Sequence, residues 1–395
     1  MNELLAILAS LQRAKAPEGV FGVPSCNQEE LHKKVQSVFR KLAKVCHEDL
    51  YLDLDQKKIA KEAFQLLNGF WEMAEKKISQ GSYGQKKTAV IEDKKDYPIV
   101  FKTTKYSYTI TNLIKSGGMC GVFGGQLQDK KGVTSPIVVK SPHSPKDNDL
   151  MEREARACDL MKKKVKSFAD NPEALEFARK LSLRVPSLLE SIKLQEPGST
   201  ARKVLNTFLV VPEFETGWFS LEEIRAVYPS GVDTKIMAFI FNRALESLTL
   251  AHVSGLVHCA ITPNHILIHA KTHSGQIVDW TASCRVGQGD KVPYLDDKYD
   301  GYFPEEIMDP KGGPSSASDL YMLAWCMVYV LGGNPQEKFI PDSVEKPIVD
   351  LLNKCLQPKR NRRPQLVEDV YREFRQIIKG LWGSRKFVEL VMPVA

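Results

Sequence analysis

Three charged side chains lie in, or at the end of, segments with a strand or helix pattern, and together they could form a binding or catalytic site. Lys140 ends the β-branched run PIVVK, Glu154 lies in the helical stretch MEREARACDLMKK, and Asp279 follows the apolar run QIV. An ammonium group can pair with a carboxylate, and one carboxylate can hold a Mg²⁺ ion that nucleotide phosphates bridge. Taken singly, Lys140 and Glu154 would form an ordinary surface ion pair worth ~0–1 kcal/mol. Their meaning therefore depends on the segments around them.

Two further stretches have residue types that suggest a site. The glycine cluster SGGMCGVF, with Ser116, Gly118 and Gly121, lies between two predicted strands, and its backbone N–H groups could cover phosphates. A glycine-rich hairpin without a ligand is the more common structure for such a cluster. The stretch HCAITPNHILIH begins at His258 and contains His265. Two histidines could indicate a metal site, but without further ligands at suitable spacing, loop or core histidines are the simpler interpretation.

The elements that must position these residues change in character along the chain. Apolar residues recur every three or four positions over 31–46 and 57–78, which predicts two antiparallel helices. The segment SQGSYGQKKTAVIEDKKD has linker composition, and strand signals follow it. From about Phe219 the helical period dominates. We expect an α+β protein with a helical module at 1–80, a linker at 81–98, a strand-rich part at 99–217, a helix-rich part at 218–384 and a tail at 385–395.

In this order, the segments from about Tyr106 to Phe374 resemble the protein-kinase family. HCAITPNH is similar to the catalytic loop H-R-D-L-x-x-x-N, PIVVK to V-A-I-K, and VDWTAS to the D-F-G segment. The resemblance implies a bilobal fold with a small β-rich N-lobe and a large helical C-lobe. It also implies that Lys140 pairs with Glu154 and that Asp279 binds Mg²⁺. Ala260 and His265 occupy the positions of the catalytic aspartate and of the second metal ligand.

Other positions follow from the same resemblance. The loop residues Ser116, Gly118 and Gly121 would cover phosphates, and Val211 and Glu213, within FLVVPEFETG, would hold the adenine edge. Pro212 removes one backbone donor there. Thr281 replaces a glycine after Asp279 and would cost backbone freedom. Further predictions concern the scaffold: PEE would place Glu305 opposite Arg363, and Asp319 would brace the catalytic loop.

Residues 18 to 80 resemble a J-domain, the DnaJ-type co-chaperone module. The pattern runs from FGVP through FRKLAKVCHED to AKEAFQLLNGFWEM. In that family a basic helix and a His-Pro-Asp loop engage a DnaK-type chaperone, so the partner-binding candidates are Lys41, Lys44, His47, Glu48 and Asp49. Glu48 stands where the family has proline, which leaves the turn less constrained. A helical hairpin used only for protein contact is the alternative.

The resemblances imply a pseudokinase that acts as a scaffold or regulator, with ATP and Mg²⁺ as the expected ligands and no catalytic residue at Ala260 or His265. One alternative is an atypical active kinase or other nucleotide-dependent transferase that uses Lys140 and Asp279. Another is a co-chaperone adaptor that recruits a DnaK-type chaperone. The expected partner is a protein, in the adaptor alternative a DnaK-type chaperone, and no nucleic-acid or membrane partner is expected.

Bulk properties limit other functions. The 55 Lys and Arg residues against 48 Asp and Glu leave a charge of +7, too small an excess to predict nucleic-acid binding. Eight scattered cysteines without C-x-x-C pairs indicate reduced thiols. The apolar segment from Leu320 is shorter than the ~20 residues that a membrane span needs. The N-terminus lacks the basic region of a signal peptide, so a cytoplasmic protein is expected.

Overall fold

The computed structural model describes most of the chain. The described residues are 2–14, 17–22, 28–47, 50, 51, 53–79, 83, 98–195, 204–212, 216–308, 313–335, 337, 339–383 and 387–393. The chain divides into two compact units, Met1–Glu92 and Asp93–Ala395, and each is described by itself. The expected linker at 81–98 lies almost entirely outside the described residues.

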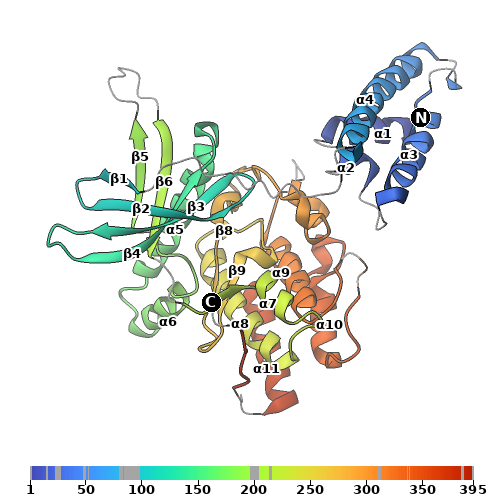
Figure 1. The fold of residues 1–395 in the computed structure, drawn as a ribbon. Coiled ribbons are helices and arrows are strands. Elements are labelled where there is room, and N and C mark those ends of the chain that lie inside the picture. Colours follow the sequence, from blue (N-terminus) through green and yellow to red (C-terminus); the bar gives the residue numbers. More distant parts are fainter. Residues whose placement is uncertain are drawn as a thin grey trace. The chain divides into compact units, whose positions relative to one another are not determined.

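The described part of the first unit is helical (Figure 1). Its helices are α1 (Asn2–Arg13), α2 (Pro17–Phe21), α3 (Gln28–Val45) and α4 (Leu54–Ser79). The two stretches with helical periodicity fall almost wholly in α3 and α4, whose apolar stripes pack together and against α1. Trp71 of α4 stacks on Phe39 of α3, with ring centroids 4.8 Å apart. Burial of these stripes stabilises the unit, because a lone amphipathic helix would leave its apolar face in water.

The second unit begins with a curled, six-stranded antiparallel sheet (Figure 1). Its strands, in spatial order, are β1 (Ile99–Lys102), β2 (Ser107–Ser116), β3 (Cys120–Gln128), β4 (Thr134–Pro142), β6 (Val204–Pro212) and β5 (Glu190–Gln195). The glycine cluster forms the turn of the β2–β3 hairpin, where the Gly117 N–H donates to the Cys120 carbonyl at 2.9 Å. Lys140 lies in the interior of this sheet, opposite Val122 on one side and Leu209 on the other.

Two helices accompany the sheet. Helix α5 (Asn148–Lys166) packs against β4 and β6 and turns the face that carries Glu154, Cys158 and Met161 inward. Helix α6 (Pro172–Ser182), which the sequence analysis did not anticipate, packs on α5 and α8. Its start has an Asn cap and a Pro at the first position: the Asn171 side chain accepts a hydrogen bond from the Ala174 N–H.

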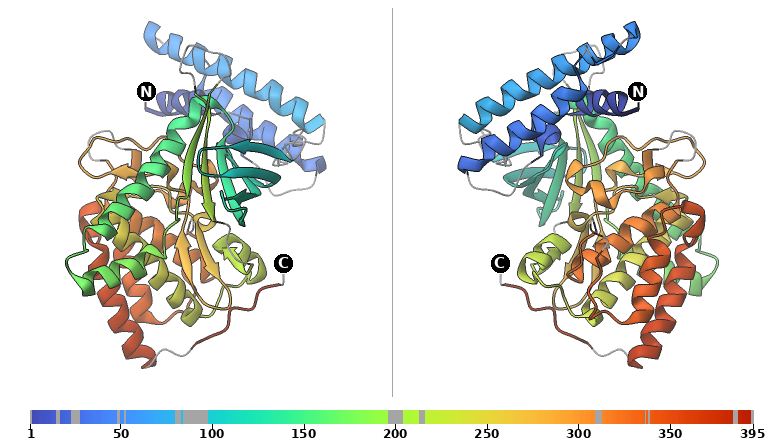
Figure 2. Two further views of the ribbon diagram at one scale, coloured as in Figure 1. Left: turned by 90° about the vertical axis from the view of Figure 1, so that its left-hand side faces the viewer. Right: turned by 90° about the vertical axis from the view of Figure 1, so that its right-hand side faces the viewer.

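The rest of the second unit is mostly helical, and Figure 1 shows its long helices gathered below the sheet. The helices are α7 (Leu221–Val227), α8 (Thr234–Val253), α9 (Ser316–Val330), α10 (Lys346–Cys355) and α11 (Val367–Trp382). Short strands lie between them: β7 (Trp218–Ser220), β8 (Leu256–Val257), β9 (Ile266–His269), β10 (Gly275–Ile277) and β11 (Cys284–Arg285). Figure 2 shows the C-terminal segment running back beside this part, where the buried Leu390 anchors it.

The mixed α+β class expected from the sequence is confirmed. Helix α9 contains the apolar segment from Leu320 and is buried nearly all round, as expected for a core helix. Among the described helices, none is long and apolar enough to cross a membrane. All seven cysteines in the described part of the chain are free and buried.

Candidate functional site

Lys140 lies between two carboxylates that come from distant parts of the chain. Its Nζ is 2.7 Å from Oε2 of Glu154 and 2.9 Å from Oδ1 of Asp279. Strand β4 presents the lysine, helix α5 the glutamate, and the turn after β10 the aspartate. The side chains are 13%, 9% and 25% exposed, so Asp279 is the member of the triad most open to solvent. The three charged candidates named from the sequence are thus brought together.

Burial and mutual attraction determine the charges of this triad. Burial would lower the pKa of the Lys140 ammonium, but the carboxylates of Asp279 and Glu154 outweigh it and raise that pKa above its usual value. Burial would raise the pKa of Asp279, yet Lys140, with His265 and Thr281, holds it well below its usual range. Burial and the negative charge of Asp279 raise the pKa of Glu154, against the effect of Lys140. Lys140 and Asp279 are therefore charged at neutral pH.

The backbone turns sharply at Asp279, whose carboxylate faces Lys140. Its φ of 65° is left-handed, an uncommon conformation outside glycine. The carboxylate accepts a hydrogen bond from the hydroxyl of Thr281, while the indole N–H of the fully buried Trp280 donates to the Ile277 carbonyl. Thr281 was expected to cost backbone freedom, but it is not among the described non-glycine residues with positive φ. The strain falls on Asp279, and Thr281 instead supports the carboxylate.

Asp319 of α9 holds the stretch that begins at His258. This fully buried carboxylate accepts hydrogen bonds from the backbone N–H groups of His258 at 2.8 Å and Cys259 at 3.0 Å. His252 Nε2 lies 2.9 Å from the same carboxylate. Cys259 needs this support, because its φ is 69°.

His258 is satisfied as a neutral imidazole in the core. Its Nε2–H donates to the Val278 carbonyl at 3.1 Å, and its Nδ1 accepts from the Ala260 N–H at 3.3 Å. Burial is the main cause that lowers the pKa of His258 to about 4. Among the described residues, no three His, Cys, Asp or Glu side chains gather as a metal site. The position of His258 is that of a structural residue.

His265 lies beside the triad and contacts Ala260. His265 Nδ1 donates to the Ala260 carbonyl at 2.7 Å, and its Nε2 is 3.5 Å from Oδ2 of Asp279. Ala260 has only a methyl side chain and cannot act as a general base. The imidazole of His265 offers nitrogen, whereas Mg²⁺ prefers oxygen ligands. The geometry thus presents one charged carboxylate and one ammonium without a neighbouring proton acceptor at position 260.

The glycine hairpin reaches this site through residues that the sequence analysis missed. Lys115 Nζ donates to Oδ1 of Asn264 at 3.1 Å, which ties the end of β2 to the stretch containing Ala260. His143 Nε2 lies 2.8 Å from the Gly117 carbonyl and 3.4 Å from the Ser116 hydroxyl. Gly118 is exposed and open above the turn, whereas a Cβ at Gly121 would meet the Phe123 ring at 2.8 Å. Hydrogen bonds across so many residues leave no local signal in a sequence.

The predicted adenine edge is only partly described. Val211 pairs with Val138 in the sheet, and Pro212 opposite Ile137 ends β6. Glu213 and Phe214 lie outside the described residues.

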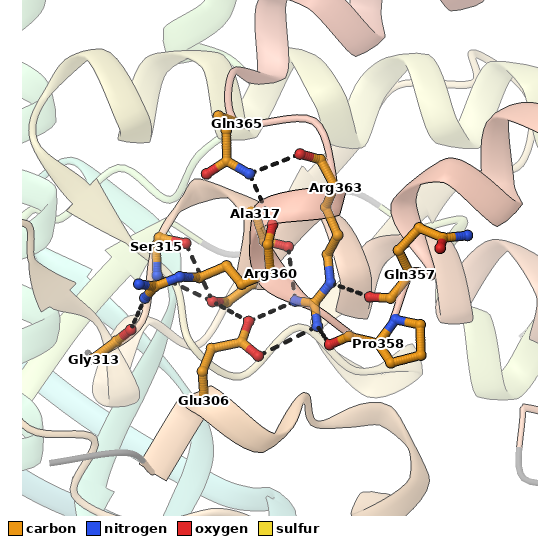
Figure 3. Close-up of polar contacts among 10 residues, drawn as sticks. Glu306, Gly313, Ser315, Ala317, Gln357, Pro358, Arg360, Arg363 and Gln365 are labelled. Atoms are coloured by element: carbon orange, nitrogen blue, oxygen red, sulfur yellow. Dashed lines mark hydrogen bonds and ion pairs between the residues drawn. The ribbon is translucent and has the colours of Figure 1, made fainter. Parts of the chain in front are cut away.

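A second ion pair links the segment before α9 to the segment before α11 (Figure 3). The Arg363 side chain is 1% exposed and donates to both oxygens of Glu306, at 2.5 Å and 3.3 Å, and to the carbonyls of Gln357 and Pro358. The sequence prediction of Glu305 in this role is wrong. Both glutamates begin a short 3₁₀ helix, whose tight turn points Glu306 at Arg363 and leaves Glu305 exposed.

In the first unit, the partner-binding candidates lie at the end of α3. Lys41 and Lys44 are exposed, and so is His47, which follows the helix. Glu48 and Asp49 lie outside the described residues.

Comparison with known proteins gives a distant similarity. No protein-family model matches the chain. The chain is 23% identical over 237 residues to a serine/threonine-protein kinase D from Synechocystis. That match covers 54% of this chain and 45% of the other protein, so the chain spans less than half the length of the curated relative. The distant similarity suggests a protein-kinase-like relationship.

Proposed function

We propose that the second unit is a bilobal, kinase-like regulatory domain that binds a nucleotide without transferring its phosphoryl group. The observation that carries this proposal is the position of Lys140, 2.7 Å from Glu154 and 2.9 Å from Asp279, beside an alanine at position 260. Lys140 suits a triphosphate, since a fixed ammonium complements phosphate oxygens. Ala260 provides no base, which phosphoryl transfer to a hydroxyl needs.

The residues fit one Mg²⁺ ion but not two. Asp279 is ionised and a quarter exposed, and one carboxylate with nucleotide phosphates is a common Mg²⁺ environment. When bound, the ion would neutralise phosphate charge. His265 is a poor second ligand because Mg²⁺ prefers oxygen. Lys140 would hold the phosphates, Glu154 would orient Lys140, and the turn at Gly118 would cover them.

Loss of the base predicts a low rate. General-base catalysis usually contributes ~10²–10⁴ in rate, and typical kinases turn over at ~1–100 s⁻¹. Loss of the base alone would leave ~10⁻⁴–1 s⁻¹. Because the residues also fit only one Mg²⁺, we expect radiolabel transfer from ATP to stay at background in the wild-type chain. The rival, an atypical transferase, would be established by transfer that disappears in both Lys140→Ala and Asp279→Ala.

Thermal unfolding tests nucleotide binding in the same proposal. ATP with Mg²⁺ at millimolar concentration should raise the melting temperature, since a ligand at ~100 Kd stabilises the folded state by ~2.7 kcal/mol. A melting temperature that ATP and Mg²⁺ leave unchanged would rule out the nucleotide site. The variant for comparison combines Lys140→Met with Glu154→Gln, which removes the ammonium without leaving Glu154 charged and unpaired.

A second function is proposed for the first unit: recruitment of a DnaK-type chaperone, with the kinase-like domain binding a protein client. Exposure of Lys41, Lys44 and His47 at one end of α3 favours it, because a basic surface can attract an acidic partner. The chain should then stimulate the ATPase of such a chaperone, and His47→Ala should abolish the effect. The control is Lys76→Ala on α4, an exposed lysine next to Glu75, which pairs with His32 near the opposite end of α3. Absence of stimulation at every ratio would eliminate this function.

A further inference from the structure

A cavity of about 560 Å³ opens between α5, α6 and the segment that joins α6 to β5. Its walls are apolar: Met161 and Val165 come from α5, Leu175 from α6, and Val185 and Leu188 from the joining segment. Cavities of roughly 300–1,000 Å³ are the usual size for small-molecule sites. This cavity lies away from the glycine turn, and no residue of the Lys140 triad lines it.

Cations from two helices surround the apolar walls. Lys162 and Lys166 lie one turn apart on α5, and Arg179 faces the same cavity from α6. All three are exposed, and within the described part of the chain none of these side chains has a hydrogen-bond or ion-pair partner. Asp159 also lines the cavity, but Nζ of Lys163 neutralises its carboxylate at 2.7 Å. The cavity therefore combines an apolar interior with an excess of unpaired positive charge.

We propose that this cavity binds an amphiphilic small molecule with an anionic head group and an aliphatic body, of which an alkyl carboxylate is the simplest case. The aliphatic body would lie against Val165, Leu175 and Val185, since removing apolar surface from water is favourable. The head group would lie near Lys162, Lys166 and Arg179, where charge-assisted hydrogen bonds form with little desolvation of buried groups. These three cations would repel the head group of a cationic amphiphile of the same length.

The cavity continues the face of α5 that carries Glu154. Cys158 lines the cavity and lies one turn after Glu154, whose charge helps raise the pKa of that thiol, after burial. Helix α5 thus contributes residues both to the cavity and to the Lys140–Glu154 pair. Binding itself does not rest on the proposed nucleotide site, so the two proposals can fail separately.

Calorimetric titration of the intact chain tests the proposal, without nucleotide and with each probe below its micelle concentration. We expect saturable binding of octanoate and decanoate. Decanoate should bind about 15-fold more tightly, because it has two more CH₂ groups and each buried CH₂ contributes about a fourfold gain. Decyltrimethylammonium should not saturate. These comparisons separate head-group recognition from general adsorption to apolar surface.

Variants locate the binding. Lys162→Ala combined with Lys166→Ala should weaken decanoate binding about tenfold or more, and both positions are exposed, so the fold should persist. Lys180→Ala is the matched control, since this lysine is on α6 but pairs with Glu176 and does not line the cavity. A second variant, Ala169→Phe, should obstruct the cavity from an exposed wall position. Absence of saturable decanoate binding at millimolar concentration would overturn the proposal. So would equal affinity in the double lysine variant, or equal affinity for decyltrimethylammonium.

Discussion

Asp319 holds two backbone N–H groups and one imidazole without any exposure to solvent. Asp319→Ala would leave those donors buried and unpaired, so we expect a loss of ~3 kcal/mol in the free energy of unfolding. Chemical denaturation measures it. Asp342→Ala, at an exposed position, should change stability by less than ~0.5 kcal/mol. Equal effects of the two substitutions would contradict the bracing role of Asp319.

His258 predicts a specific pH dependence of stability. Burial lowers its pKa to about 4 in the folded chain, whereas an unfolded histidine titrates near ~6.5. The unfolded chain therefore binds more protons between these values, and the folded state loses stability as pH falls from ~6.5 to ~4. This residue should account for ~3 kcal/mol, with the loss levelling off below pH ~4. Unfolding free energies of wild type and His258→Gln, compared across this range, isolate the effect. Parallel pH curves for the two proteins would refute it.

Single residues of the site differ in how far the sequence could predict them. Lys140, Glu154 and Asp279 each lie in, or directly after, a segment with a clear strand or helix pattern, so the sequence alone could identify them as candidates. The partner of Arg363 was misassigned to Glu305, because one residue along a 3₁₀ helix changes the direction of a side chain. Lys115 was missed because its contact with Asn264 spans 149 positions and has no periodic signal.

Among the elements, the turn before α8 and the end of α9 approach each other at two glycines. Gly231 has a φ of 94°, and a Cβ there would lie 2.1 Å from the Leu331 carbonyl oxygen. Gly231→Ala should therefore destabilise the fold by ~3 kcal/mol or more. Gly132→Ala is the matched control: its φ is 84° but nothing lies within 4 Å, so only ~1 kcal/mol of backbone strain is expected. Thermal unfolding of both variants measures the difference. Similar melting temperatures would mean that the close approach does not constrain the elements.

Long elements were easier to predict than short ones for a physical reason. From Leu320 to its end, helix α9 has no charged residue, which indicates a buried core helix, and α4 has an apolar residue at every third or fourth position. Helix α6 has only 11 residues, and its packing on α5 and α8 rather than its own pattern stabilises it. The cavity between α5 and α6 could not be predicted, because a cavity is a property of packing.

At the scale of the whole molecule, buried charged side chains hold distant segments of the second unit together. Asp319 and Arg363 are buried and paired, and the partly buried Lys140 pairs with both Glu154 and Asp279, which stabilises the second unit. Ala260 and His265 lie beside them without offering a base or an oxygen ligand. The mixed α+β class followed from the change of periodicity along the chain.

The most direct measurement is calorimetric titration of the intact chain with ATP in the presence of Mg²⁺, in parallel with the Lys140→Met/Glu154→Gln double variant. Melting curves should first show that the double variant is folded. We predict saturable binding to one site in the wild type and at least ~10-fold weaker binding in the variant, because the ammonium no longer faces the phosphates. Binding of equal affinity in both proteins, or no binding up to millimolar ATP, would contradict the proposed nucleotide site.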